Sequence, residues 1–382
     1  MLLVCLGLAL AGCTTRTLPV VDAETHATQR ETPLKVGVYV GRGPGGVGAV
    51  EWLRLVEESP DMELKLVDGV QVRQGALDGL DVLVMPGGAS KTEFESLGTN
   101  GVARMKAFIR KGGGYIGTCA GCCLLMDGPK QRANVIPWNS TGSESDLLFP
   151  RFKLTDAGRK AMGLTNQTVV MRYHGGPFMW PTTNRIEGAK FELWGTYDAE
   201  ATFRGALKKQ KKMYGAAAIV GGTYGKGRVF VTAAHPEYFD STLDIVQAAF
   251  RYVTGRTVAF PSRVRTPRAV SVGYLTTFAM SLQTARDVLT LAKERDFDLV
   301  PVNGDGIFTR ALDHVDVLVV PDSSKKLSDV SLRLIRAFAA RGGKVVAYGG
   351  GVKLLPEGRG SVACGSMEEA VKAIHGLFPR QK

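Results

Sequence analysis

The sequence predicts an α/β fold with a mostly parallel sheet covered by helices on both faces, followed by a second, smaller and degenerate copy. Three observations lead to this prediction: strand-like runs alternate with amphipathic helical stretches, glycine-rich turns follow the strands, and the second half repeats motifs of the first. The 382 residues, 45% of them hydrophobic and 22% charged, suffice for two soluble domains that each bury a core.

Strands and helices alternate from residue 34 onward. In chain order we expect strands at 34–41 and 62–67 around a helix at 47–57, a strand at 80–88, a helix at 102–111 and a strand at 115–117. Four more strand-like segments, TVVMRYHGG, FELWGTYDA, GAAAIVGG and GRVFVTAAHPE, precede a helix at 242–254. Pro261 and Pro267 then predict a linker at 257–268.

The segment after the linker repeats the first half. ALDGLDVLVMPGGASK at 76–91 aligns without a gap on ALDHVDVLVVPDSSKK at 311–326, and residues 105–125 align on 335–355 after a five-residue deletion. A third match joins KVGVYVG to AVSVGYL, so an internal structural repeat is predicted over 269–382. Gly349 replaces Cys119 in the second copy, and Asp322-Ser323 replace Gly87-Gly88, so we expect this copy to lack any chemistry of the first.

The N-terminal stretch MLLVCLGLALAGC resembles the signal sequence of a bacterial lipoprotein. It is too short to span a membrane as a helix, and LAGC at 10–13 matches the lipobox, whose cysteine is lipidated. We therefore expect a signal peptide at 1–13, a flexible tether at 14–33 and an extracytoplasmic protein held to a bacterial membrane by lipid on Cys13. Thr14 is typical of lipoproteins on the periplasmic face of the outer membrane, and a simple cleaved signal peptide is the alternative.

Charge and composition exclude several other partners. The formal net charge is +12, but the basic residues are scattered, and the densest run at 208–212 is interrupted by Gln210 and indicates a solvated loop. We therefore expect no nucleic-acid partner. No second cysteine pair or histidine cluster completes a metal site, and Pro44 within GRGPGG argues against a dinucleotide loop, so neither metal nor cofactor is expected.

The stretch GGGYIGTCAGCCLL places three cysteines within five residues. A strand that runs into Gly-x-Cys-x-Gly and then into a helix has the sequence form of a nucleophile elbow, which exposes Cys119 at a helix N-terminus that favours thiolate. Cys119 and Cys122 also form a C-x-x-C pair, which suits a redox function. Packing of all three thiols is a further interpretation.

His235 is the histidine best placed to act as a base for Cys119. It directly follows the strand GRVFVTAA, at the carboxyl edge where open parallel sheets place their sites. Glu237 follows across Pro236, whose fixed φ holds the turn, and its carboxylate can meet the imidazole.

These residues resemble the class I glutamine amidotransferase superfamily, which has a flavodoxin-like fold and a Cys-His-Glu triad. The shared motifs are PGG after a strand, GTCAG at an elbow and HPE after a later strand. Within the superfamily the chain is most similar to the biotin-protein ligase N-terminal domain family, which combines the motifs found here at 85–88, 112–121 and 225–237. The resemblance covers about residues 34–255, within a domain predicted at 34–256.

The resemblance implies a role for each matching residue. Cys119 is the nucleophile, His235 its base, and Glu237 the residue that orients the imidazole. The backbone N–H groups of Gly88 and Ala120 are implied to form the oxyanion hole, aimed at the charge that develops on attack.

The resemblance also implies substrate contacts at Gly87, Tyr173 and His174, although a structural glycine turn explains the last two equally well. Glutaminases of this superfamily carry Gln where this chain has Cys123, which argues against glutamine as substrate. We expect a free-standing thiol hydrolase or amidase that acts on a small-molecule or peptide amide through a Cys119 acyl-enzyme. The alternatives are a non-catalytic ligand-binding or scaffolding lipoprotein with a relict site, and a C-x-x-C redox protein.

Overall fold

The computed structural model describes most of the chain from residue 32 onward. The described ranges are 32–128, 131–143, 147–198, 213–238, 240–261, 270–276, 279–294, 296–303, 311–321, 327–356 and 360–379. The predicted signal peptide with Cys13, nearly all of the predicted tether and most of the predicted linker lie outside these ranges. Of the helices within them, none has the length and apolar character needed to cross a membrane.

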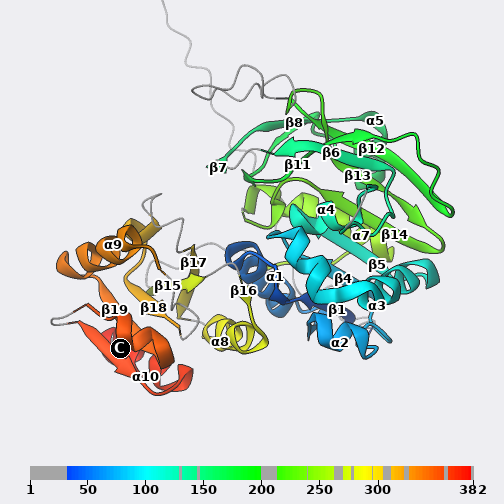
Figure 1. Ribbon diagram of the computed structural model, residues 1–382. Helices are drawn as coiled ribbons and strands as arrows, with labels where there is room; N and C mark the ends of the chain where they lie inside the picture. Colours follow the sequence, from blue (N-terminus) through cyan, green and yellow to red (C-terminus); the bar gives the residue numbers. More distant parts are fainter. Residues whose placement is uncertain are drawn as a thin grey trace, which may run out of the picture. The chain divides into compact units, whose positions relative to one another are not determined.

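The first half folds around an 11-stranded sheet whose five parallel strands lie together at one end (Figure 1). In spatial order these strands are β3 (Met62–Val67), β1 (Leu34–Tyr39), β4 (Val82–Met85), β5 (Gly114–Thr118) and β14 (Gly227–Thr232). Each neighbouring pair in this series runs parallel. The spatial order is 2-1-3-4-5 when the strands are numbered along the chain, which is the flavodoxin-like order, so the predicted fold class is confirmed.

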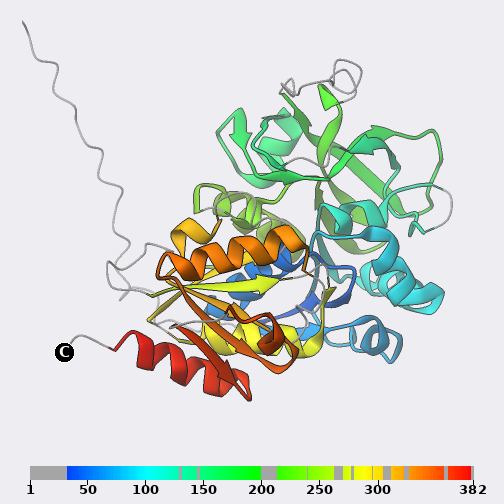
Figure 2. The same ribbon diagram turned by 60° about the vertical axis from the view of Figure 1, so that its left-hand side comes forward.

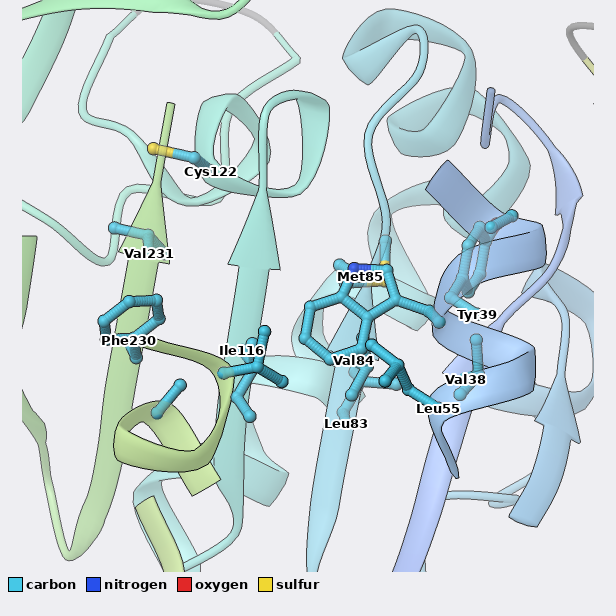
Figure 3. Packing of buried hydrophobic residues seen from close by; sticks show 14 of the residues in the cluster. Val38, Tyr39, Leu55, Leu83, Val84, Met85, Ile116, Cys122, Phe230 and Val231 are labelled. Carbon is cyan, nitrogen blue, oxygen red and sulfur yellow. The ribbon is translucent and has the colours of Figure 1, made fainter. Parts of the chain in front are cut away.

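Helices cover both faces of this parallel core (Figure 1). They are α1 (Gly46–Glu58), α2 (Gly69–Arg73), α3 (Ser90–Lys111), α4 (Ala120–Leu125) and α7 (Leu243–Thr254). On one face, Trp52 of α1 meets Phe250 of α7 edge to face, with ring centroids 6.3 Å apart. Figure 3 shows part of the buried core, with side chains from β1, β4, β5 and β14. Burying each such apolar side chain stabilises the fold by about 1.5–3 kcal/mol.

An antiparallel extension continues the sheet beyond β14. It consists of β13 (Ala217–Tyr224), β12 (Ala189–Tyr197), β8 (Arg151–Leu154) and β9 (Thr168–Val170), with β11 (Pro177–Pro181) and β6 (Trp138–Ser143) branching from β13. A helix, α5 (Asp156–Met162), packs against β12, and β10 (Tyr173–His174) pairs with β7 (Leu147–Leu148). The single strand expected over TVVMRYHGG is therefore two, because β9 and β10 pair with different partners.

The second copy forms its own five-stranded parallel sheet (Figure 2, yellow to red). Its strands, in spatial order, are β17 (Phe297–Asn303), β15 (Val270–Thr276), β18 (Val317–Val320), β19 (Lys344–Tyr348) and β20 (Ser361–Cys364). The order is again 2-1-3-4-5. Helices α8 (Leu282–Ala292), α9 (Asp329–Ala340) and α10 (Met367–Leu377) accompany it, and a short ribbon pairs β16 (Ala279–Met280) with β2 (Gly41–Arg42). Four 3-10 turns also lie within the described ranges: Pro236–Tyr238, Asp240–Thr242, Ala311–His314 and Gly349–Leu354.

Strand register confirms the repeat and corrects one of its matches. Gly37 lies opposite Leu83 in the first sheet, and Gly273 lies opposite Leu318 in the second. The two glycines are therefore equivalent positions. The structural alignment of these two strands differs by two residues from the match of KVGVYVG to AVSVGYL that the sequence suggests.

The same register extends to the end of each sheet. Thr232 pairs with Thr118, as Cys364 pairs with Tyr348, which places Met367 at the position of His235. The second copy therefore lacks the histidine as well as the cysteine.

Candidate active site

Cys119 sits at a sharp turn between β5 and α4. Its φ of 50° and ψ of −102° are values that residues other than glycine rarely adopt. The turn depends on its small neighbours, since a Cβ on Gly121 would lie 2.2 Å from the carbonyl oxygen of Met85. The second copy preserves this backbone, with Gly349 at φ 55°. The predicted strand–turn–helix geometry is thus present.

His235 and Glu237 follow β14, the strand beside β5. His235 Nδ1 lies 2.8 Å from Glu237 Oε1, and Thr118 Oγ1 donates to the same oxygen at 3.5 Å. Glu237 is fully buried, and His235 is 6% exposed. A neutral imidazole that donates from Nδ1 to this carboxylate keeps Nε2 as a proton acceptor, which is the tautomer that a general base requires.

Gly87 occupies the space between Cys119 and His235. A Cβ at residue 87 would lie 3.0 Å from Cys119 Cβ, 3.3 Å from His235 Nε2 and 2.4 Å from His235 Cε1. Cys119 and the imidazole therefore border the same small volume, and only glycine leaves that volume open. The structure brings the three residues of the predicted triad together around this point.

A cavity of about 260 Å³ opens over these residues. The loops after four parallel strands line it: Gly45–Gly48 after β1, Gly87 and Gly88 after β4, Cys119 after β5, and His235 and Tyr238 after β14. Arg172 and His174 form a further wall. The carboxyl edge of an open parallel sheet is where such folds hold ligands, so the position matches the prediction.

The predicted oxyanion-hole donors lie next to the nucleophile. The backbone N–H of Gly88 donates to the Cys119 sulfur. Two bonds fix the loop that carries it: Gly45 N–H donates to Gly87 O at 2.6 Å, and Ala89 N–H donates to Gly43 O at 2.7 Å. Ala120 begins α4, where backbone N–H groups have no acceptor within the helix.

Cys119 is a neutral thiol in this structure. It is 5% exposed, and its Sγ donates to the carbonyl oxygen of His174 at 3.5 Å. Burial raises the pKa of the Cys119 thiol well above its ordinary value, nearby Cys123 raises it further, and the bond from Gly88 acts in the opposite direction. The sequence-based expectation of a favoured thiolate is therefore not met, because desolvation outweighs the helix terminus. Attack by Cys119 requires a base.

Only one of the two aromatic candidates from MRYHGGP reaches the cavity. His174 lines it, whereas Tyr173 is fully buried and donates its hydroxyl to Gly176 O at 2.8 Å. The Tyr173 ring also stacks on Phe178, with centroids 6.1 Å apart. The placement of Tyr173 matches the alternative interpretation, a glycine turn with a packed aromatic.

Among the charged and aromatic residues that line the cavity, sequence reasoning missed Arg172 and Tyr238. The Arg172 guanidinium lies 3.8 Å from the centroid of the Tyr238 ring, and both residues line the cavity. The available signal was their closeness in sequence to predicted site residues: Arg172 lies two residues before His174, and Tyr238 directly follows Glu237.

The remaining cysteines of the cluster face other groups. Cys122, labelled in Figure 3, is fully buried. Its Sγ lies 3.4 Å from Met179 Sδ. Burial raises the pKa of Cys123 to about 11, and Ser90 hydrogen-bonds its thiol. All four cysteines within the described ranges are free thiols. In the same part of the chain, no group of three or more His, Cys, Asp or Glu side chains could hold a metal ion.

Comparison with known families gives a match over part of the chain. The family described as "Biotin-protein ligase, N terminal" matches residues 77–124, the segment that holds the MPGG and GTCAG motifs. The match confirms the resemblance over this segment and supports the general glutamine amidotransferase-like superfamily. None of the curated proteins matches the chain.

Solved structures with a similar fold share little sequence with this chain. A protein described as ThuA-like from Bacteroides uniformis is 10% identical with a TM-score of 0.44, over 61% of this chain and 96% of its own. A second ThuA-like protein, from Parabacteroides merdae, is 13% identical with a TM-score of 0.42, over 59% of this chain and 92% of its own.

Proposed function

We propose that this chain is a thiol hydrolase that cleaves an amide through an acyl-enzyme on Cys119. One observation carries the proposal: His235, whose Nδ1 lies 2.8 Å from the buried Glu237 carboxylate, lines the same cavity as Cys119, and both border the space at Gly87. A nucleophile, a base and a group that orients the base are the elements of covalent acyl transfer. The family match over residues 77–124 supports the superfamily but does not identify a substrate.

In the first half of the reaction, Cys119 attacks the substrate carbonyl. Nε2 of His235 takes the thiol proton as Sγ forms its bond to carbon, and the negative Glu237 carboxylate stabilises the resulting imidazolium. The electron pair of the carbonyl moves onto oxygen, where the N–H groups of Gly88 and Ala120 receive the charge. Because the thiol is neutral at rest, this proton transfer accompanies the attack.

In the second half, the tetrahedral intermediate collapses. The carbon–nitrogen bond breaks, and His235 returns its proton to the leaving amine. His235 then removes a proton from water, the hydroxide attacks the thioester carbon, and the carbon–sulfur bond breaks to release the acid. As the carbon–sulfur bond breaks, the Cys119 sulfur takes the proton from His235, and the thiol is restored.

A second candidate function, ligand binding without catalysis, is favoured by the burial of Cys119. A thiol that is 5% exposed, with a pKa well above its ordinary value, is poorly reactive unless a base assists it. The second copy, which has Gly349 and Met367 in place of the cysteine and histidine, also keeps the fold without the chemistry.

Four other expectations stay predictions. Lipid anchoring through Cys13 and an extracytoplasmic location concern residues outside the described ranges. A peptide or small-molecule amide as substrate follows only from the proposed chemistry. A redox role for Cys119 and Cys122 is less well supported, since their sulfurs contact His174 O and Met179 Sδ respectively.

The pH dependence of Cys119 alkylation by iodoacetamide, measured by peptide mass spectrometry on the reduced full chain, separates the two candidates. At pH 7 we expect His235→Ala to slow alkylation roughly 10²-fold or more, the range of general base assistance. The rate of this variant should rise steadily from pH 7 to 10, because its thiol must ionise unaided. His314→Ala, at an exposed histidine of the second copy, is the matched control and should behave as wild type. Equal rates in wild type and His235→Ala would leave ligand binding as the function.

A further inference from the structure

Arg172 places a positive charge on the wall of the Cys119 cavity. The residue directly precedes β10, and its backbone carbonyl accepts a 2.8 Å hydrogen bond from the His235 N–H, so its position relative to the imidazole is fixed. The guanidinium lies over the Tyr238 ring, 3.8 Å from the centroid, a contact that suits the planar, delocalised charge of arginine. The proposed mechanism does not use this side chain.

No carboxylate among the described residues forms an ion pair with Arg172, and none lines the cavity. The two acidic side chains that act electrostatically on Tyr238 have other close neighbours: Glu237 lies 2.8 Å from His235 Nδ1, and Glu51 lies 3.9 Å from the Arg54 guanidinium. The charged and polar side chains of the described lining are Arg172, His174, His235, Tyr238, Ser143 and the Cys119 thiol. The part of the cavity wall that the structure describes therefore carries the positive charge of Arg172 and no carboxylate.

Another part of the lining adds hydrogen-bond donors. Residues Gly45–Gly48 are the N-cap and first turn of the 13-residue helix α1, and they line the same cavity. This helix has no side-chain cap and no acidic residue in its first turn. Its free N–H groups and its dipole therefore reinforce the preference of the Arg172 wall for a negative group.

We propose that the substrate of this site carries a carboxylate close to its scissile carbonyl, and that Arg172 binds this carboxylate. The inference rests on the proposed function and names its substrate class. The cavity, about 260 Å³, is smaller than the roughly 300–1,000 Å³ of pockets that enclose drug-sized ligands, so it accommodates a small acyl group. Arg172 is therefore a specificity-determining residue: it selects an anionic acyl group, and Cys119 attacks the adjacent carbonyl.

Two alkylating reagents that differ in charge test this subsite. Iodoacetate carries a carboxylate beside its reactive carbon, whereas iodoacetamide is neutral and of nearly equal size. The ratio of their alkylation rates at Cys119 is compared with the same ratio for N-acetylcysteine amide in the same buffer. We expect wild type to favour iodoacetate about tenfold more than the free thiol does, as one charge-assisted hydrogen bond allows.

Substitutions of Arg172 test whether its guanidinium causes the preference for iodoacetate. Arg172→Gln should return the ratio to the free-thiol value, whereas Arg172→Lys should retain part of the preference because it keeps the charge but not the planar donors. Arg151→Gln, at an exposed arginine paired with Asp198, is the matched control and should leave the ratio unchanged. A ratio that is the same in wild type and Arg172→Gln overturns the subsite.

A second measurement does not depend on thiol reactivity. In the Cys119→Ser protein, titration with malonate should shift the imidazole NMR signals of His235, and Arg172→Gln in the same background should abolish the shift. Equal shifts of the His235 signals in both proteins, or no shift in either, contradict the proposal. A shift with inorganic phosphate but not with malonate also contradicts it, and would show that the site recognises phosphate and not a carboxylate. If alkylation is insensitive to His235→Ala while the reagent ratio still depends on Arg172, acyl transfer fails and the anion subsite stands.

Discussion

Glu93 is a buried carboxyl group whose removal should change how stability depends on pH. It lies in the first turn of α3, is fully buried, and neither carboxyl oxygen has a hydrogen-bond partner within the described residues. The loop after β1 covers it so closely that a Cβ on Gly43 would lie 2.6 Å from Glu93 Cγ. Burial raises the pKa of Glu93 from 4.5 to about 8.

The raised pKa fixes the sign and size of the effect. The folded state holds the Glu93 proton more tightly than the unfolded state, so its contribution to stability is complete below pH 4.5 and is lost as pH rises through about 8. Each unit of pKa difference corresponds to roughly 1.4 kcal/mol, so the loss between these pH values amounts to roughly 5 kcal/mol. Glu93→Gln removes the titrating proton, and the free energy of unfolding of this variant should lack that fall.

Urea unfolding of the full chain between pH 4.5 and 9 measures the difference. All four tryptophans, at positions 52, 138, 180 and 194, lie in the first half, so their fluorescence reports its unfolding. Relative to wild type, Glu93→Gln should gain stability steadily as pH rises. Glu95→Gln, at a partly exposed glutamate on the same helix, should follow wild type. Identical pH dependence in wild type and Glu93→Gln would refute the assignment of a buried titrating carboxyl.

Three further substitutions have expected outcomes. Gly87→Ala should leave the circular dichroism spectrum unchanged but slow Cys119 alkylation at least tenfold, because the new Cβ would lie 2.4 Å from His235 Cε1. An unchanged rate would show that Cys119 and His235 do not cooperate in alkylation. Gly349→Cys should give a thiol whose alkylation titrates like that of an ordinary cysteine, since Met367 occupies the histidine position; a base-assisted profile would contradict the register. Tyr173→Phe should lower the free energy of unfolding by about 1 kcal/mol through loss of one buried hydrogen bond, with Cys119 alkylation unchanged; a slower alkylation would instead assign Tyr173 to the site.

The parallel core could be predicted because its signals are local. Apolar runs such as LDVLVMPGG bury both faces of a strand, and glycines at 87, 117 and 121 mark places where backbone or side chains approach too closely for a Cβ. The repeat followed from matching residues, and register then settled which positions are equivalent. The antiparallel extension was only partly predicted, because its strands pair across long stretches of chain and short segments such as β10 carry no period of their own.

Within the candidate site, the triad residues could be found from motifs, but their electrostatics could not. Whether a helix terminus or burial controls the pKa of Cys119 depends on how completely surrounding loops exclude water, which the sequence does not show. Arg172 and Tyr238 were missed for a similar reason: β10 brings Arg172 to the end of β14 through a bridge with His235, and this contact spans many residues. Tyr173 was assigned to the substrate together with His174 because of the family resemblance. Adjacent residues point in opposite directions along a strand, and only His174 lines the cavity.

The acyl-enzyme itself can be sought with p-nitrophenyl acetate, an activated ester whose leaving group needs no proton. Reduced full-length protein is mixed with the ester, and the acetylated residue is identified by mass spectrometry while nitrophenolate release is followed. We expect a burst of nitrophenolate, an acetyl group on Cys119 that turns over in wild type, no burst in Cys119→Ser, and an unchanged burst in Cys122→Ser. Absence of acetyl from Cys119, or a burst that survives Cys119→Ser, would contradict a thiol nucleophile at this position.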